Sequence, residues 1–247
     1  MCSSFYRAVP ALVFALLAAG CASGPQATPS DPLEPMNRAV FSANQTIDQY
    51  VATPVAKGYR EAVPGPVRTA VRNFFSNLGD VSNLVNNLLQ GRGVAAAETG
   101  MRLAVNSVLG IGGLIDIATP AGISTHHTDF GLTLGAWGMP PGPYLVLPVL
   151  GPSSVRDGAG VVVNAALSPA TYLDPSASFG LYGASFVDTR TNLLPATDLI
   201  SLAALDKYSF MRDGYLQRRR YLLNEDQSTS DVVAGDGYSN EEATSPG

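Results

Sequence analysis

Hydrophobic positions recur at three- and four-residue spacing over most of this chain, which is the pattern of amphipathic helices. The first such run starts at Met36, and Pro54 either ends it or opens its next turn. Gly79, Gly91 and Gly110 are placed to end three later helices. The pattern predicts further helices over residues 66–78, 80–89, 94–109, 154–167, 178–193 and 197–221. The chain is therefore expected to be mainly α, with little strand.

Residues 130–155 break this pattern, because they form 26 consecutive residues without a charge that include five glycines and five prolines. Each proline removes a backbone donor, so the stretch cannot be one regular membrane-spanning helix. One interpretation makes Tyr144–Val149 a core strand between turns. The other makes the stretch irregular backbone that lies at membrane depth and is buried in protein or lines a cavity.

Five asparagines are concentrated in the helices predicted before Gly91: Asn73, Asn77, Asn83, Asn86 and Asn87. One interpretation is a pair of polar stripes facing solvent. The alternative is that the amides bond between helices or line a wet path.

The N-terminus has the pattern of a lipoprotein export signal. Arg7 is the only charge in the first thirty residues, and residues 11–20 form an apolar run too short to span a bilayer. The run ends at Ala-Gly-Cys, which predicts removal of residues 1–20 and acylation of Cys21. A proline-rich segment, residues 21–35, then suits a flexible tether. Cys2 leaves with the signal, so no thiol remains for a disulfide, a metal or catalysis.

The charge distribution limits the function further. After residue 20 the chain has 14 basic and 20 acidic residues, and six of the acids lie in residues 225–247. This tail is expected to be disordered, and residues 36–224 are expected to form one domain. That body is balanced in charge, so it has no basic field for nucleic acid. Between Phe130 and Val187 only Arg156, Asp157 and Asp174 are charged, which indicates a surface facing lipid or a protein.

Several motifs resemble those of the VacJ/MlaA family of outer-membrane lipoproteins. They begin with DPLEPMNR (31–38), NFFSNL (73–78), LLQG (88–91) and LGIGGLID (109–116). They continue in the family's order with DFGLTLG (129–135), GPYLVLP (142–148) and RD (156–157). Leu132 departs from the glutamine usual in the family, and His126-His127 precede the aspartate of the DFG-like motif.

The resemblance implies a helical, ring-shaped single domain with irregular Gly/Pro-rich segments around a central amphipathic channel. It implies that misplaced phospholipid leaves the outer leaflet of the outer membrane of a Gram-negative bacterium through this channel. The protein would be lipid-anchored on the periplasmic side, bound to a trimeric porin, and would pass lipid to a soluble periplasmic carrier. The candidate channel or hinge residues are Gly112, Gly113, Leu114, Ile115, Asp116, Asp129, Phe130, Gly131, Leu134, Gly135, Trp137, Tyr144, Arg156 and Asp157. The glycines are expected to be hinges or close-packing points, and the charged residues either structural ions or gating groups.

Two other classes of protein are weighed. A lipid hydrolase would need a nucleophile and a base, but the only histidines are His126 and His127, and there is no Gly-x-Ser-x-Gly elbow. We expect these histidines to be solvated, with no metal, no cofactor and no enzyme activity. The second class is a passive envelope scaffold that binds outer-membrane proteins, for which Arg218-Arg219-Arg220 is the best docking patch. The alternative interpretation is that these arginines mark an exposed helix end.

Overall fold

A computed structural model describes residues 31–236 of the chain, with side chains up to Asn224, so Cys21 and the predicted signal lie outside the described residues. The described part is mainly helical. Its elements are α2 (Glu34–Ile47), the π-helix η1 (Asp48–Ala52), α3 (Thr53–Ala62), α4 (Gly65–Leu89), α5 (Gly93–Val108), α6 (Phe130–Ala136), β1 (Tyr144–Leu147), β2 (Gly151–Ser154), α7 (Val155–Leu167), the 3-10 turn η2 (Pro169–Tyr172), α8 (Pro175–Ala203) and α9 (Lys207–Asp236).

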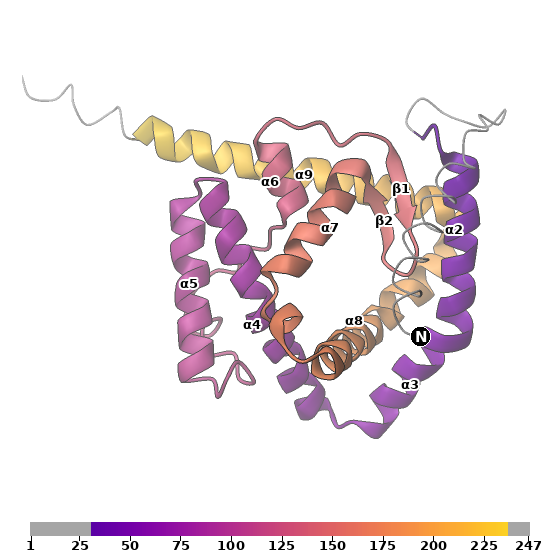
Figure 1. The fold of residues 1–247 in the computed structure, drawn as a ribbon, viewed down its shortest axis with the longest axis horizontal. Helices are drawn as coiled ribbons and strands as arrows, with labels where there is room; N and C mark the ends of the chain where they lie inside the picture. Colours follow the sequence, from indigo (N-terminus) through magenta and orange to yellow (C-terminus); the bar gives the residue numbers. More distant parts are fainter. Residues whose placement is uncertain (1–30, 237–247) are drawn as a thin grey trace, which may run out of the picture.

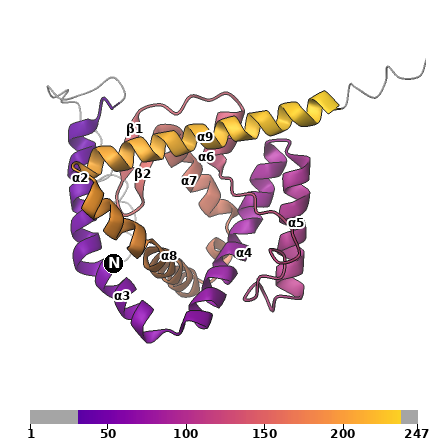
Figure 2. The same ribbon diagram turned by 180° about the vertical axis from the view of Figure 1, so that it is seen from behind.

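These elements are arranged as a ring (Figure 1). The continuous run α2–η1–α3 forms one side, and the α4–α5 hairpin forms the opposite side. Helices α7 and α8 and the β1–β2 hairpin bound the centre. Seen from behind, α9 crosses the ring from the α2 side and continues past α5 (Figure 2).

Helix α4 is longer than its sequence predicts, because Gly79 lies inside it and does not end it. The expected helix start at Asp80 is therefore wrong. A glycine in a helix interior costs only about 1 kcal/mol relative to alanine. The α4 segment on both sides of Gly79 packs along α5 through Asn77, Asp80 and Asn83, which are all buried. These contacts are sufficient to keep the helix continuous.

The predicted break between residues 193 and 197 is also wrong, since α8 runs through Pro195. A proline inside a helix costs about 3 kcal/mol. Around this point α8 is held against the α2–α3 side of the ring. The Thr191 hydroxyl donates to the Ala56 carbonyl, and Arg190 donates to Asp48 at 2.8 Å. Tertiary contacts thus outweigh the local signal.

The charge-free stretch, residues 130–155, begins with helix α6, which the sequence pattern did not predict because the stretch is rich in glycine. Asp129 caps α6 by accepting a hydrogen bond from the Leu132 N–H. The strand expected at Tyr144–Val149 is present as β1, which pairs antiparallel with β2. Tyr144 and Val146 of this strand form a core cluster with Tyr208 of α9. The core-strand interpretation is therefore confirmed for Tyr144–Leu147.

The predicted start of α7 is confirmed, because the Ser154 hydroxyl accepts a hydrogen bond from the Asp157 N–H. The domain boundaries need two corrections. Asp31 is fully buried and bonds Asn37 and Tyr208, so the tether does not extend to residue 35. Helix α9 continues through residues 225–236, so the predicted disorder does not begin at residue 225.

Candidate functional site

The α4–α5 hairpin has polar side chains inside and apolar side chains outside. Four polar residues of α5 are buried against α4: Thr99, Arg102, Asn106 and, in part, Ser107. On the opposite face of α5, Val94, Met101 and Val108 recur at seven-residue spacing and are 66%, 56% and 78% exposed. This order is the reverse of that in a water-soluble helical hairpin.

The asparagines of α4 bond between elements. Asn77 donates to Ser107 of α5 at 2.9 Å, and Asn87 donates to Thr99 at 3.4 Å. Asn86, fully buried, accepts from the Thr133 hydroxyl of α6 and donates to Asn164 of α7 at 3.2 Å. The solvent-facing interpretation is therefore wrong for the buried asparagines, and the alternative of bonds between helices is confirmed.

Arg102 fixes the loop that follows α5. It is 4% exposed and donates to the Thr119 hydroxyl and the Ile123 carbonyl. It lies 3.5 Å from Asp116 and 3.9 Å from Asp80. Burial raises the pKa of the Asp80 carboxyl, and the Asn83 amide and the Arg102 charge offset this only in part. The Asp116 side chain is 30% exposed and forms an ion pair with Arg102.

A second ionic network ties α9 to α6 and α7. Arg219 donates to Asp129, the N-cap of α6, at 2.9 Å and to Asp157, in the first turn of α7, at 2.8 Å. Asp157 also accepts from Arg156 at 3.0 Å and from the Tyr215 hydroxyl. Burial alone would raise the pKa of Asp157, but the Tyr215 hydrogen bond and the Arg219 charge hold it below its ordinary value.

Three candidate glycines are points of close packing. A Cβ at Gly131 would lie 2.5 Å from the Asp157 carboxylate, and one at Gly135 would lie 2.7 Å from the Arg156 guanidinium. A Cβ at Gly113 would lie 2.6 Å from the Asn77 amide, and Gly113 also has φ +88°. The helices approach so closely at these points that no larger residue fits without movement.

Leu114 and Trp137 contact α4 at two separate places. The Leu114 carbonyl accepts from Asn73, inside the helix, whereas the Trp137 indole donates to the Leu89 carbonyl at its C-terminal end. Asn73 and Leu89 are 89 − 73 = 16 residues apart, about 24 Å along a helix. Leu114 and Trp137 therefore do not lie side by side. Tyr144, a candidate channel residue, is only 2% exposed and belongs to the core of the wall.

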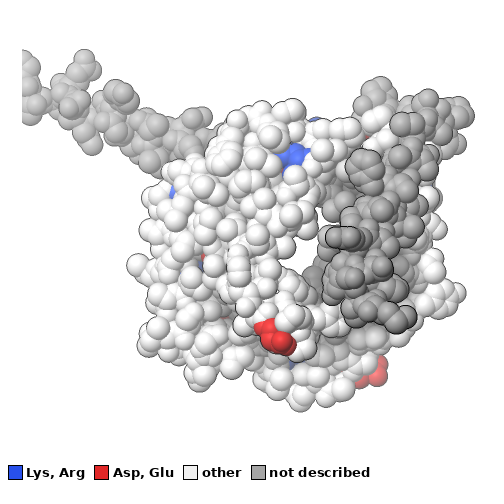
Figure 3. Space-filling view, in the orientation of Figure 1, with Lys and Arg blue, Asp and Glu red and all other residues white. Residues whose placement is uncertain are grey.

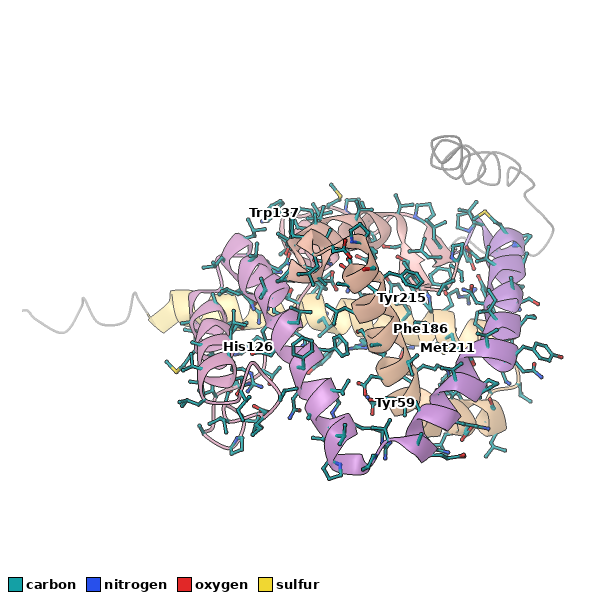
Figure 4. All side chains as sticks on the ribbon, turned by 60° about the horizontal axis from the view of Figure 1, so that its bottom comes forward. Tyr59, His126, Trp137, Phe186, Met211 and Tyr215 are labelled. Atoms are coloured by element: carbon teal, nitrogen blue, oxygen red, sulfur yellow. The ribbon has the colours of Figure 1, made fainter. Side chains whose placement is uncertain are left out.

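An opening lies at the centre of the ring in Figure 3, and the described residues visible beside it are mostly uncharged. Tyr59 of α3, Phe186 of α8, and Met211 and Tyr215 of α9 lie around this centre (Figure 4). None of the four was a candidate from the sequence. The spacing of Phe179, Tyr182 and Phe186, all more than 40% exposed, could have indicated such a face on α8.

The remaining sequence candidates are placed as follows. His126 is half-buried and contacts Glu98, so it is not simply solvated, whereas His127 is exposed. Among the described residues no cluster of three potential metal ligands occurs. Arg219 points into the ring wall, and Arg218 and Arg220 are exposed. The three arginines are thus neither one docking patch nor a helix end.

A family model described as MlaA lipoprotein matches residues 29–222, which is most of the chain. The chain belongs to the MlaA lipoprotein family. The resemblance drawn from the motifs is thereby confirmed. Within residues 31–236, no helix combines the length and hydrophobicity that crossing a bilayer requires.

Three relatives with the same printed name are similar to this chain over most of its length. Proteins named intermembrane phospholipid transport system lipoprotein MlaA, from Shigella flexneri and Escherichia coli (strain K12), are each 35% identical over 214 residues. The match covers 84% of this chain and 85% of each relative. The protein of the same name from Haemophilus influenzae is 31% identical over 87% of this chain and 89% of its own length.

One solved structure, described as the structural basis for maintenance of bacterial outer membrane lipid asymmetry, matches with a TM-score of 0.70 and 34% identity. The match covers 78% of this chain and 99% of that chain. The expected single, mainly α domain of this family is confirmed.

Proposed function

We propose that this chain is the lipoprotein of an intermembrane phospholipid transport system and helps to maintain outer-membrane lipid asymmetry. Its relatives carry the first activity in their names, and the matching structure concerns the second. The similarity extends over nearly the whole of each relative, so the proposal concerns the complete domain.

The observation that carries this proposal is the inverted order of polar and apolar side chains in the ring wall. Polar side chains of α4 and α5 hydrogen-bond to one another inside the hairpin, while Val94, Met101 and Val108 face outward. On the other side of the ring, Tyr50 and Val51 are 71% and 57% exposed. A protein in a bilayer needs this order, with apolar groups at its edge and polar groups turned inward to bond one another.

The opening supplies a route for lipid. Each CH₂ of an acyl chain resists transfer to water by about 0.8 kcal/mol, so a path from membrane to periplasm has to shield the chains. Phe186 and Met211 at the centre of the ring provide apolar surface for the chains (Figure 4). In this proposal phospholipid enters from the outer leaflet and leaves toward the periplasm.

The anchor and partners are part of the proposal. Cys21 carries the lipid anchor on the periplasmic side of the outer membrane of a Gram-negative cell. A trimeric porin holds the ring in the membrane, and a soluble periplasmic carrier accepts the phospholipid. These assignments rest on the sequence motifs and the signal ending in Ala-Gly-Cys.

We also propose that the protein is not an enzyme. Replacing both His126 and His127 by alanine separates the two classes. A hydrolase would lose its function, whereas a lipid channel should keep it. The Glu98 contact of His126 makes a modest loss of stability possible, so protein levels are measured in parallel.

The proposal as a whole is tested by measuring phospholipid exposed on the outer leaflet of cells that contain or lack this protein. We expect exposure to rise in its absence and to return to normal when the gene is restored. Equal exposure in the two strains would refute the transport function.

A further inference from the structure

Three helices meet at one corner of the ring and bring polar side chains together there. Helix α8 runs through the corner between α3 and α4 (Figure 1, Figure 2). The Thr191 hydroxyl of α8 donates to the Ala56 carbonyl of α3 at 3.3 Å. Asp188 lies one turn from Thr191 along α8, and Tyr59 lies one turn from Ala56 along α3. Burial and the Asp188 charge raise the pKa of the Tyr59 hydroxyl, so the two side chains lie close together.

Two arginines of α4 complete the group. Arg68 and Arg72 are four residues apart and therefore lie on the same face of the helix. The Arg68 Nε donates to the Val63 carbonyl at 3.1 Å, which turns this side chain back toward the end of α3. Both arginines interact electrostatically with Asp188, and neither forms an ion pair with a carboxylate in the described part of the chain. We call Tyr59, Arg68, Arg72 and Asp188 the corner cluster.

The groups of the corner cluster are incompletely bonded by the described residues. Asp188 is only 5% exposed, and the Asn192 amide donates to its Oδ2 at 3.1 Å, whereas its Oδ1 accepts no hydrogen bond from them. Burial raises the pKa of the Asp188 carboxyl, and its arginine and amide neighbours offset this only in part. The Tyr59 hydroxyl is buried and has no hydrogen-bond partner among the same residues. Since buried polar groups are normally hydrogen-bonded, the corner cluster has the features of a site for a polar ligand.

The charges of the corner cluster determine which ligand fits. Guanidinium groups bind phosphate oxygens through paired hydrogen bonds, while a carboxylate accepts hydrogen bonds from an ammonium group. A free phosphate ion would bond the arginines but would be repelled by Asp188. A glycerol phospholipid has the phosphate and no cation. An ethanolamine phospholipid carries a phosphate and a primary ammonium group a few bonds apart, so it matches both halves of the cluster.

We infer that the corner cluster is a headgroup site selective for ethanolamine phospholipids, with Arg68 and Arg72 on the phosphate and Asp188 on the ammonium group. Tyr59 lies beside the centre of the ring (Figure 4), so the site borders the route proposed for the acyl chains. This inference rests on the proposed function and adds a headgroup preference to it.

The test measures which phospholipids the full-length lipidated protein retains. The purified protein is mixed with equal amounts of phosphatidylethanolamine and phosphatidylglycerol in detergent micelles and purified again, and its bound lipid is quantified by mass spectrometry. We expect the wild type to retain several-fold more phosphatidylethanolamine. Asp188→Asn should bring the ratio close to one, because it removes both the ammonium partner and the charge that repels an anionic headgroup. Arg72→Gln should lower the retention of both lipids several-fold, since both use the phosphate partner.

The matched control is Arg60→Gln, which removes the same charge from an exposed position in the last turn of α3. It should retain both lipids as the wild type does. Thermal unfolding shows whether each variant is folded. Because Arg72 is exposed, Arg72→Gln keeps the test decisive if Asp188→Asn does not fold.

Each result decides a separate question. If the wild type retains both lipids equally, or if folded Asp188→Asn keeps the preference, the headgroup inference is overturned and the transport function stands. If inorganic phosphate alone protects the wild type against thermal unfolding and does not protect Arg72→Gln, the cluster is a site for free phosphate, which also overturns the inference. If the wild type retains neither lipid, the inference fails, and outer-leaflet phospholipid in cells decides whether the proposed function fails with it.

Discussion

Replacing Arg219 by methionine should destabilise the fold strongly, because this side chain holds three helices together. Its guanidinium lies 2.9 Å and 2.8 Å from the carboxylates of Asp129 and Asp157, and the Asp157 side chain is only 8% exposed. Removing one partner of a buried ion pair costs about 3–5 kcal/mol. The Asp129 side chain is 33% exposed, so water screens part of the effect and we expect about 3 kcal/mol.

The loss of unfolding free energy in Arg219→Met should become smaller as the pH falls. Asp157 has a pKa below its ordinary value in the folded protein, since the Tyr215 hydrogen bond and the Arg219 charge outweigh the opposing effect of burial. A lowered pKa contributes stability that is complete above the unfolded-state value of about 3.9 and is lost as pH falls through the folded-state value. The difference between wild type and Arg219→Met should therefore be full at pH 7 and shrink below about pH 4.

Thermal unfolding in detergent measures both effects. A loss of about 3 kcal/mol corresponds to a fall in Tm of about 6–12 °C in a domain of this size. The matched control is Arg218→Met, on the exposed neighbouring position of the same helix, which should change stability by less than about 0.5 kcal/mol. Equal Tm values for the two variants, or a deficit of the same size at pH 7 and pH 3.5, would refute the structural role assigned to Arg219.

Three further changes test other features. Gly131→Ala forces a Cβ to within 2.5 Å of Asp157 and should cost about 1–3 kcal/mol of unfolding free energy, while Gly180→Ala, with open space around it, should not destabilise. Asn86→Ala removes one hydrogen bond to Thr133 and one to Asn164 from the network between α4, α6 and α7, so denaturant unfolding should show a loss of about 1–3 kcal/mol. Cys21→Ala should leave an unlipidated precursor that fails to fractionate with mature outer-membrane lipoproteins; normal fractionation would contradict the lipoprotein assignment.

The sequence by itself determined the helical class and those element ends that depend on local chemistry. Ser154 and Asp157 predict the start of α7 because an N-cap bond forms between residues three apart. Gly91, with φ +72°, ends α4 because other residues rarely adopt that conformation. The order of motifs over residues 31–157 was also sufficient to recognise the family. Each of these signals acts within a few residues.

Only the tertiary structure decided which local signals are overridden. Gly79 and Pro195 are breakers in sequence, yet both lie inside helices because neighbouring helices supply contacts that outweigh their cost of about 1 and 3 kcal/mol. From the sequence Asp31 was predicted to belong to a flexible tether. In the structure it is buried, and its carboxylate accepts a hydrogen bond from Tyr208, 177 residues later in the chain.

The candidate site shows the same limit. The motifs identified Asp129, Asp157 and Trp137, but not that Arg219 joins the two carboxylates to α9 or that the Trp137 indole donates to the Leu89 carbonyl of α4. Leu114 and Trp137 are only 23 residues apart in sequence, yet they contact α4 at points that are separated by 16 residues of helix. The place of each candidate residue in the ring depends on long-range packing. A single sequence does not show which residues far apart in the chain come into contact.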